Sequence, residues 1–442
     1  MAGVENLGVR LSARPRVAVV GGGWAGLAAA VTLADWAEVT VFEAGRVLGG
    51  RARRLARAPD GVFDNGQHLL LGAYSECLRL MRRVGAAPEA LLWRTPQRLD
   101  MAGEHSFAMP PWPAPLNQLA GWLGWRGAPW GERWRWLRAL LALRAQGFAA
   151  PPEQTVADWL RQQGQSAWLT RTFWEPLTLA ALNTPIERAA MACLAAVLRD
   201  GVAGPAAHSD MLMPRVDLSA LFPEPAAHWL TAQGHAIRVG YRVKSLFPVQ
   251  DGVEVDGEHF AAAVLATAPQ HVTALLDRKR EDAADWLAPI NKLDYQPIYT
   301  VYLRAHRPEA LPQPWLGLVD APWGQWVFDR QRCTGHAGWL ALVISGPGPH
   351  QAWSAAELLS RAAAGLNQRF AGLGAQAEGQ VIAERRATFS CDAGLARAAA
   401  QGPWPRLALA GDHVAGPYPA TLEGAVRSGA HAAYLLKKVL NC

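Results

Sequence analysis

The chain has 442 residues, of which 50% are hydrophobic and 18% are charged. This composition excludes a disordered protein and predicts two domains with a large core. The net charge of +6 is modest, and no basic run or nucleic-acid motif is present, so nucleic acid is excluded as a partner, whereas anionic cofactors and anionic lipid surfaces are favoured.

Cysteine usage and hydropathy predict the compartment. The five cysteines are scattered and form no C-x-x-C pair, which argues against a disulfide framework and against a zinc or other metal site. Residues 1–15 contain no apolar core of a signal peptide, and no window of about 18 apolar residues is available to span a membrane. A cytoplasmic protein is therefore expected, and peripheral association with the inner membrane stays open.

A glycine-rich turn follows the first predicted strand. The apolar residues 17–20 predict a short buried strand, and residues 27–34 predict the start of a helix. Gly21 permits a tight turn, Gly23 allows a pyrophosphate to approach the backbone, and Gly26 allows the helix to pack closely on the strand. Together with the helix N-terminus, this turn predicts a dinucleotide site. The glycines of the G-x-G-x-x-G turn are Gly21, Gly22, Gly23 and Gly26.

A second apolar strand, residues 38–42, ends at Glu43. This carboxylate lies 17 residues after Gly26, close to the spacing expected of the acid that binds a ribose hydroxyl. The following loop brings Gly50 and Arg51, whose fork-shaped guanidinium can neutralise a diphosphate. A glycine turn without a nucleotide is the weaker interpretation, because it requires neither the flanking strands nor the acid.

Residues 63–74, FDNGQHLLLGAY, combine turn chemistry with an apolar run. Asp64 opens the turn, and Gln67 and His68 follow it directly. A histidine beside a glycine turn either faces a cofactor or is a satisfied structural residue, and this stretch alone does not separate the two interpretations. All three polar residues are therefore candidates for catalysis.

Residues 109–136 are rich in tryptophan and proline, with arginines interleaved. Tryptophan and arginine in this pattern are typical of a monotopic contact with a membrane–water interface. A tryptophan-rich wall around an apolar core is the alternative, because the apolar positions extend too far round a helix for a clean amphipathic stripe. Both interpretations stay open, and both favour an apolar substrate. The six tryptophans are Trp112, Trp122, Trp125, Trp130, Trp134 and Trp136.

The rest of the chain alternates helices with strands of two sheets. Helices are predicted over 153–200, a buried strand over 261–268, strands of a second sheet over 295–304 and 339–345, and a final core strand over 407–410. Strands of the nucleotide-binding domain therefore occur near both ends of the chain. That domain must be discontinuous, because foreign segments separate its strands.

These elements predict an α/β fold with two domains. A Rossmann-like nucleotide-binding domain is predicted from residues 1–84, 231–285 and 385–442. A substrate domain of mixed sheet and helix is predicted from residues 85–230 and 286–384, and it contains the tryptophan-rich stretch.

Three motifs near the two chain ends resemble the superfamily of flavin-containing amine oxidases and phytoene desaturases. They are GGGWAG, FEAGRVLGGRA and a distant AGD followed by TLEGAVRSG. Within the superfamily, FDNGQHLLLGAY, QWVFDR and PATLEGAVRSG are most similar to the family of hydroxysqualene dehydroxylases, also called squalene-associated FAD-dependent desaturases. The resemblance covers the whole chain and implies an amine oxidase-like fold with FAD as cofactor.

The resemblance also implies where FAD is held. The glycine turn would hold the pyrophosphate, Glu43 the adenosine ribose, and Gly50 and Arg51 would lie along the phosphates. Val243 would contact the adenine region through its backbone. Near the flavin, the residues implied are Gly411 and Asp412 at the ribityl-phosphate end, the backbone N–H of Leu422 at the ring, and Gln67 and His68 in an element close to it.

Two positions depart from the pattern of the superfamily. His413 replaces the aromatic residue expected after the Gly-Asp pair, and the segment 417–419, Pro-Tyr-Pro, replaces a Gly-Leu-Pro-like turn. These departures leave the cofactor prediction intact and put details of the substrate face in question.

The resemblance implies an enzyme that reduces hydroxysqualene to squalene, in squalene and hopanoid biosynthesis. Protonation of the allylic hydroxyl and loss of water would give a resonance-stabilised cation that accepts hydride from reduced flavin. This chemistry needs a dry pocket, aromatic walls and an acid near the leaving oxygen. His68 and Asp64 are the candidates for the acid. Candidates for the walls are Trp174, Trp326 and Phe328.

Two other functions are compatible with the fold. A carotenoid-type desaturase would use the same flavin in the oxidative direction, which the sequence does not distinguish. A non-enzymatic prenyl-group carrier, as in Rab GDP-dissociation inhibitors, is disfavoured because every FAD motif is present. No second dinucleotide fingerprint follows a strand, so no NADPH domain is expected and the external reductant is not identified.

Overall fold

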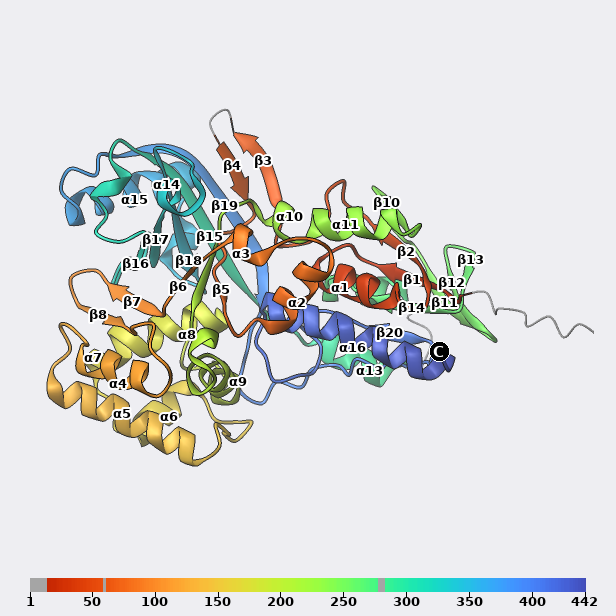
Figure 1. The fold of residues 1–442 in the computed structure, drawn as a ribbon, viewed down its shortest axis with the longest axis horizontal. Coiled ribbons are helices and arrows are strands. Elements are labelled where there is room, and N and C mark those ends of the chain that lie inside the picture. The colour runs from red at the N-terminus through yellow and green to blue at the C-terminus, as the bar shows by residue number, and fades with distance from the viewer. Residues whose placement is uncertain (1–13, 59–60, 277–282) are drawn as a thin grey trace, which may run out of the picture.

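A parallel five-stranded sheet organises the lobe that contains the first strand and the C-terminal helix (Figure 1). The structure, a computed structural model, describes residues 14–58, 61–276 and 283–442. Most of the segment on which the signal-peptide expectation rests, residues 1–13, lies outside this range. In sheet order, the strands are β10 (Ala236–Val239), β2 (Glu38–Glu43), β1 (Arg16–Val20), β14 (Ala262–Leu265) and β20 (Leu407–Leu409).

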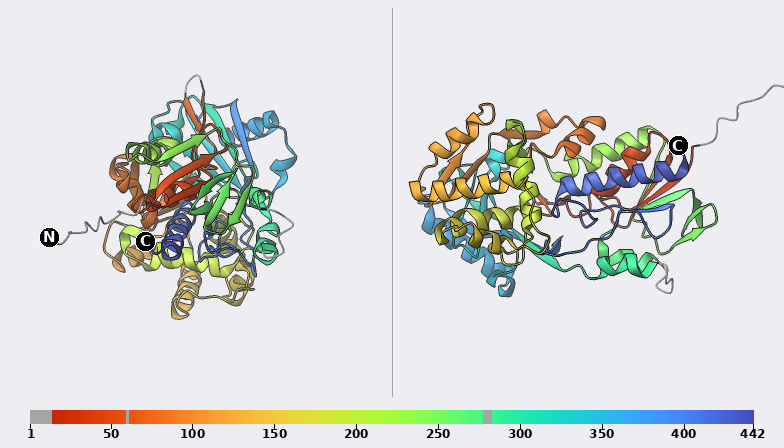
Figure 2. Two further views of the ribbon diagram at one scale, coloured as in Figure 1. Left: turned by 90° about the vertical axis from the view of Figure 1, so that its right-hand side faces the viewer. Right: turned by 90° about the horizontal axis from the view of Figure 1, so that it is seen from below.

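Side chains alternate between the two faces of this sheet, as expected for a strand period of two. Val17 and Val19 pack into one hydrophobic cluster with helices, and Ala18 and Val20 pack into another on the opposite face. Figure 2 shows the C-terminal helix lying along this lobe. The helices of the lobe are α1 (Trp24–Leu33), α2 (Ser75–Arg83), α10 (Leu218–Leu221), α11 (Pro223–Ala232), α12 (Pro269–Leu275), α13 (Ala284–Asn291) and α16 (Leu422–Leu440).

A mostly antiparallel seven-stranded sheet forms the second lobe, with only β16 and β7 paired in parallel. Helix α15 (Ala355–Arg369) packs along β19 and β15. In sheet order, the strands are β19 (Ala375–Phe389), β15 (Tyr295–Ala305), β18 (Trp339–Ser345), β17 (Trp326–Asp329), β16 (Trp315–Gly317), β7 (Arg98–Met101) and β8 (His105–Ala108).

A helical layer lies below this sheet in the view of Figure 1. It includes the two helices of the tryptophan-rich stretch and a π-helical segment, η1, that runs directly into α8. Asn183 ends α8 in the left-handed conformation, and Pro176 lies in the first turn of α8, where proline does not interrupt a helix. The segments of this layer are α4 (Leu116–Leu123), α5 (Trp130–Ala145), α6 (Val156–Gln162), α7 (Ala167–Leu169), η1 (Thr170–Trp174), α8 (Glu175–Leu182), α9 (Met191–Leu198) and η2 (Arg199–Ala203).

Smaller strands and helices complete the described chain. The strands form three small sheets, β3 with β4, β5 with β9 and β6, and β11 with β12 and β13. Their bounds are β3 (Arg54–Ala58), β4 (Gly61–Asp64), β5 (Leu70–Leu71), β6 (Leu92–Thr95), β9 (Met211–Pro214), β11 (Leu246–Val249), β12 (Gly252–Val255) and β13 (Glu258–Phe260). The short helices are α3 (Pro88–Leu91), η3 (Ala206–His208), η5 (Pro308–Ala310), α14 (Arg330–Thr334) and η6 (Pro349–Ala352).

Two predicted domain boundaries differ from the structure. Residues 218–230 were assigned to the substrate domain, but Leu221, Phe222 and Leu230 are fully buried in the hydrophobic cluster of α1 and the parallel sheet. The boundary at residue 385 falls inside β19, which continues in the second sheet to Phe389. Both boundaries depend on long-range packing, which local periodicity does not report.

Candidate functional site

One cavity of about 1210 Å³ extends from the glycine turn into the helical layer of the second lobe. This volume exceeds the range of about 300–1,000 Å³ that is usual for a single small molecule. The end near the parallel sheet is lined by backbone and polar groups, and the other end by aromatic and aliphatic side chains. The cavity therefore has room for a large cofactor and an apolar substrate together.

The glycine turn forms a cradle at the first end. The backbone N–H of Gly21 donates to the carbonyl oxygen of Phe42 (2.8 Å), which fixes the turn between β1 and β2. A Cβ on Gly26 would overlap the carbonyl oxygen of Gly21, so the predicted close packing of helix on strand is present. A Cβ on Gly23 would meet no protein atom closer than the Cα of Gly50 at 3.7 Å. Gly23 lines the cavity, which leaves this space for a ligand.

Helix α1 begins at this cradle without a side-chain cap. Its first backbone N–H groups and the positive end of its dipole are thus available to an anion. Gly50 lies opposite, with a φ of +61°, in a loop that approaches the turn through a hydrogen bond from the Gly49 N–H to the Gly22 carbonyl (2.8 Å). This backbone-lined gap fits the pyrophosphate of a dinucleotide.

Glu43 lies at the end of β2 and lines the cavity. Its two carboxylate oxygens accept hydrogen bonds from the backbone N–H groups of Gly22 (2.7 Å) and Gly45 (2.6 Å). A carboxylate has about four lone-pair positions, so acceptors remain for a ribose hydroxyl. Val243 is buried in the same hydrophobic cluster as Val20 and Phe42 and also lines this end, and its contact with the adenine region stays a prediction.

Arg51 and Asp412 join the two ends of the chain across the cavity. Arg51 Nη2 contacts Asp412 Oδ1 at 2.6 Å, and its Nη1 donates to the carbonyl oxygen of Ala387 (2.6 Å). Burial raises the pKa of Asp412, but the charges and hydrogen bonds of Arg51 and His413 outweigh burial and hold the pKa well below its ordinary value. Asp412 is therefore ionised, and Arg51 is oriented by it.

The N-terminus of α16 forms the next part of the wall. Thr421 caps the helix by accepting from the N–H of Gly424 (3.1 Å), and Leu422 follows as the first helical residue on the cavity. Gly411 precedes Asp412 on the same wall, with its N–H donating to Ser428 Oγ (3.1 Å). The predicted FAD residues from both chain ends are thus assembled around one cavity.

The three catalytic candidates separate in the structure. His68 and Gln67 line the cavity, whereas Asp64 is buried outside its lining. Asp64 Oδ1 accepts from the N–H of Leu218 (3.0 Å). Burial raises the pKa of Asp64 to about 6, although the Leu218 N–H and the Arg330 charge act in the opposite direction. The carboxyl of Asp64 therefore lies behind the cavity lining, because its strand, β4, directs it toward α10, and a role of Asp64 in catalysis stays a prediction.

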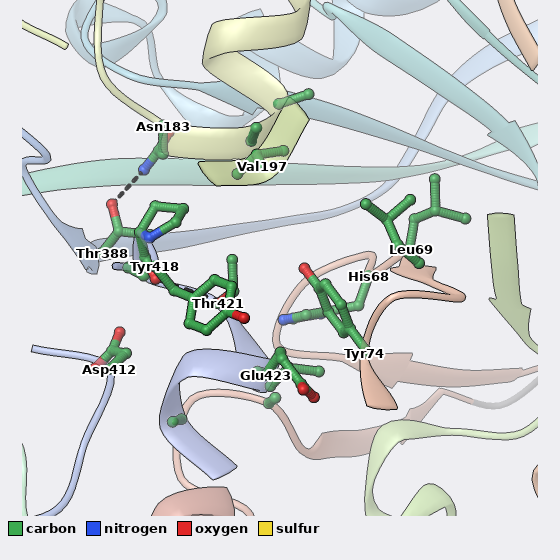
Figure 3. A pocket seen from close by; sticks show the side chains of 18 of the residues that line it. His68, Leu69, Tyr74, Asn183, Val197, Thr388, Asp412, Tyr418, Thr421 and Glu423 are labelled. Carbon is green, nitrogen blue, oxygen red and sulfur yellow. Dashed lines mark hydrogen bonds between the residues drawn. The ribbon is translucent and has the colours of Figure 1, made fainter. Parts of the chain in front are cut away.

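His68 faces the cavity beside Tyr74 (Figure 3). Its Nδ1 lies 3.0 Å from the carbonyl oxygen of Gly66, which only accepts, so Nδ1 carries the proton. Burial lowers the pKa of His68 and outweighs the hydrogen bond to the Gly66 carbonyl, which raises it, and the nearby Arg51 charge lowers it by a smaller amount. Gln67 Oε1 accepts from Nη1 of the buried Arg330 (3.1 Å), which orients the amide.

The far end of the cavity is apolar. Trp174, Trp326 and Phe328 line it, in agreement with the walls predicted from the sequence. Trp122 and Trp136 of the tryptophan-rich stretch share this lining with further aromatic residues that the sequence did not indicate as walls, namely Phe107, Phe148, Phe173 and Trp315. Rings at this end meet edge to face, as in the pair Phe173 and Trp174 with centroids 5.1 Å apart.

The six tryptophans of the tryptophan-rich stretch divide into two groups. Trp122, Trp125 and Trp136 are buried at 7%, 0% and 8% exposure, whereas Trp112, Trp130 and Trp134 are 53%, 57% and 54% exposed. The three buried tryptophans fit the interpretation of a wall around a core, and for the three exposed ones the membrane contact stays a prediction. Buried and exposed members touch, because the Trp122 ring packs against Trp130 and Trp134.

Three polar residues on the cavity wall were missed by the sequence reasoning. Tyr74 lies in the predicted FDNGQHLLLGAY stretch, and Tyr418 lies in the Pro-Tyr-Pro segment that departs from the superfamily pattern. Asp200 follows α9 and receives the hydroxyl of Tyr418 in a hydrogen bond of 2.8 Å. The sequence could have indicated Tyr74 because it belongs to a motif, and Tyr418 because its segment departs from the superfamily pattern. No sequence feature indicates Asp200.

A glycine cradle, a paired arginine and a helix N-terminus around one cavity define a dinucleotide-binding protein whose site continues into an apolar chamber. The profile of the family described as flavin containing amine oxidoreductase matches residues 24–436. The chain belongs to this family and is an FAD-dependent oxidoreductase, so the predicted superfamily, fold class and cofactor are confirmed.

Individual relatives place the chain within this family. It is 28% identical over 453 residues to a hydroxysqualene dehydroxylase of Rhodopseudomonas palustris, with 95% of this chain and 98% of the relative covered. It is 26% identical to a probable zeta-carotene desaturase of Synechococcus elongatus, with 65% of this chain and 66% of the relative covered. The crystal structure of an oxidoreductase from Methanosarcina mazei shares the fold at a TM-score of 0.75 and 14% identity, covering 95% and 99% of the two chains.

Proposed function

We propose that this oxidoreductase reduces hydroxysqualene to squalene. The observation that carries the proposal is the single cavity that joins the FAD cradle to an apolar, aromatic-lined chamber. A branched C30 alcohol with no charge requires such a chamber, because it gains binding energy only by leaving water. The similarity to a hydroxysqualene dehydroxylase over nearly the full length of both chains supports this substrate over others.

The reaction requires three events at one allylic carbon. The C–O bond breaks, the oxygen leaves with an added proton as water, and the carbon receives a hydride. Reduced FAD supplies that hydride when it is bound. The aromatic walls exclude water, and their ring faces stabilise positive charge on the allylic carbons, with Trp174 and Phe173 among the nearest-packed rings of the chamber.

The proton is assigned to His68, with Gln67 beside it. In its cationic form His68 donates from Nε2 while Nδ1 stays hydrogen-bonded to Gly66. Because burial lowers the pKa of His68, the cation is a minor but strongly acidic form at neutral pH. Dehydroxylation needs this proton at oxygen, whereas desaturation of a hydrocarbon does not.

Anaerobic turnover tests this function. The FAD-loaded protein is reduced, mixed with hydroxysqualene, and analysed for squalene and for reoxidation of the flavin absorbance. One squalene per flavin is expected. In a parallel reaction, the oxidised protein is mixed with phytoene, the substrate of the alternative desaturase. Desaturated phytoene without squalene formation from hydroxysqualene would contradict the proposal and favour the carotenoid desaturase.

The surface of α4 and α5 supports a second proposal about the partner. Seven of the thirteen exposed large hydrophobic side chains in the described part of the chain lie between residues 112 and 141. Leu119 and Leu141 are exposed and also line the cavity, so this surface continues into the cavity at these two residues. We call it the α4–α5 apolar face, and it comprises Trp112, Leu116, Leu119, Leu123, Trp130, Trp134 and Leu141.

We propose that the α4–α5 apolar face docks on the anionic lipid surface of the inner membrane, from the cytoplasmic side. Residues 109–148 contain five arginines and one glutamate, which complements anionic headgroups. Exposed tryptophans suit the membrane–water interface. Within the described residues, no helix is both long and apolar enough to cross a bilayer. Peripheral docking at the cavity mouth would let a C30 lipid enter without crossing water.

Vesicle co-sedimentation tests this docking. The triple variant Trp112→Ser, Trp130→Ser, Trp134→Ser is compared with Phe247→Ser, Tyr434→Ser, which removes exposed rings from the other lobe. Phosphatidylcholine vesicles with and without phosphatidylglycerol are used. Loss of binding only in the triple variant, stronger binding to the anionic vesicles and unchanged flavin absorbance are expected. Equal binding of wild type and triple variant would contradict the proposal.

A further inference from the structure

Tyr418 and Asp200 form a polar pair in the cavity that the reaction as described above does not use. Tyr418 lies in the loop that leads into α16, and Asp200 lies in η2. Both line the cavity, and the hydroxyl of Tyr418 donates to Asp200 Oδ2 at 2.8 Å. Figure 3 shows the Tyr418 ring reaching into the cavity from the side opposite His68 and Tyr74.

The direction of this hydrogen bond is fixed by charge. Asp200 Oδ1 also contacts Arg199 Nε at 2.7 Å. Burial raises the pKa of Asp200, but the Arg199 guanidinium and the Tyr418 hydroxyl outweigh burial and lower it. An ionised carboxylate only accepts hydrogen bonds, so the phenol must donate to it. The remaining acceptor capacity of the phenol oxygen is left for the cavity.

The phenol is also held in place. The carbonyl oxygen of Tyr418 accepts from Arg397 Nη1 (2.9 Å), and the Arg427 guanidinium lies over the ring with its carbon 5.3 Å from the centroid. Proline on either side restricts the backbone of this segment. Tyr418 therefore presents an acceptor at a fixed position, four residues before Leu422 at the start of α16.

We propose that the Tyr418 oxygen, held by Asp200, accepts a hydrogen bond from the hydroxyl of an allylic alcohol substrate and thereby selects the alcohol over the hydrocarbon product. The inference rests on the proposed function, because it assigns the same cavity a hydroxyl-bearing substrate. A site built to hydrogen-bond a hydroxyl disfavours an analogue that lacks it. Squalene has no hydroxyl, so this contact is lost when the product forms and release is favoured.

Equilibrium binding to the oxidised holoenzyme tests the pair, because oxidised flavin has no hydride to give and hydroxysqualene is not consumed. Tyr418→Phe removes only the phenol oxygen. We expect the dissociation constant for hydroxysqualene to rise about tenfold, the usual size of one hydrogen bond, and that for squalene to stay unchanged. Tyr434→Phe makes the same substitution on an exposed face of α16 and should change neither constant.

The Asp200 variants separate positioning from packing. Asp200→Asn keeps an acceptor for the Tyr418 hydroxyl and should retain most of the preference for hydroxysqualene, whereas Asp200→Ala should lose it several-fold. Asp200→Ala also serves as the test variant if Tyr418→Phe loses flavin. Equal weakening of both ligands, or no change in either, would overturn the inference. A wild type that makes squalene but binds both ligands equally also overturns it, while leaving the proposed function intact.

Discussion

The two ends of the cavity are built in different ways. The FAD end uses backbone groups of a few glycines and polar partners with fixed distances, such as Gly22 with Glu43 and Arg51 with Asp412. The apolar end uses large side chains from several helices and strands, which are held mainly by packing against one another. We therefore expect a small side chain added at a glycine to disrupt the FAD end. At the apolar end we expect the loss of a large side chain to be required for a comparable effect.

This difference matches FAD and the proposed isoprenoid substrate. A pyrophosphate is recognised by directed hydrogen bonds and charge, which require the backbone at a defined position. An isoprenoid chain offers no such groups, so the chamber is defined by shape and by the exclusion of water.

Gly23→Val should abolish FAD binding without unfolding the protein. The φ of −77° at Gly23 suits any residue, and the added side chain would enter the space assigned to the pyrophosphate. A loss of affinity of at least about a thousandfold, equal to about 4 kcal/mol, is expected. Flavin absorbance of the purified protein measures it. Gly131→Val, in exposed helix α5, is the matched control, and a full complement of FAD in Gly23→Val would place the cofactor elsewhere.

Trp125→Ala should destabilise the second lobe and leave the FAD cradle formed. Trp125 is fully buried, packs against Phe107, Trp136 and Phe173, and donates from Nε1 to His105 Nδ1 (3.0 Å). A loss of about 3–5 kcal/mol in the free energy of unfolding is expected. Urea unfolding followed by circular dichroism measures the loss, with the exposed Trp112→Ala as control. An unchanged midpoint would show that packing does not hold this end.

His68→Phe should retain FAD and slow squalene formation by about a hundredfold, the usual size of a general-acid contribution. In the wild type, the rate should rise as pH falls toward the lowered pKa of His68, because only the cation donates the proton. Stopped-flow reoxidation of the reduced flavin by hydroxysqualene measures both effects. A variant with wild-type rate and pH profile would make His68 a structural residue, and the proton would then have to come from elsewhere in the cavity.

Asp64→Asn should change the pH dependence of stability and leave the cavity intact. Folding raises the pKa of Asp64 to about 6, so its favourable contribution is complete below the unfolded value and is lost as pH rises through 6. The variant lacks this loss and should gain on the order of 2 kcal/mol over wild type between pH 4 and pH 7.5. Thermal unfolding at both pH values measures it. Reduced turnover with an unchanged pH dependence of stability would contradict this prediction and indicate that Asp64 takes part in catalysis.

Local sequence patterns are sufficient to predict the core of the FAD end. Strands β1 and β2, the glycine turn and Glu43 lie within 28 residues, from Arg16 to Glu43. Each is a local pattern of strand period, turn chemistry or spacing. The resemblance then connected this end to Asp412 and Leu422. Local patterns were sufficient because the backbone itself binds the phosphates, and the glycine spacing specifies that backbone.

Long-range pairs, the burial of single tryptophans and the direction of the Asp64 carboxyl depend on the tertiary structure. Arg51 pairs with Asp412 across 361 positions and Tyr418 with Asp200 across 218, distances over which no sequence period extends. Trp136 is buried and Trp134 is exposed although both lie in the same tryptophan-rich stretch, because α5 packs on the second lobe by one face only. The carboxyl of Asp64 points away from the cavity because the direction of β4 places it at the N–H of Leu218. Burial and direction are properties of the packed elements, and a single segment does not contain them.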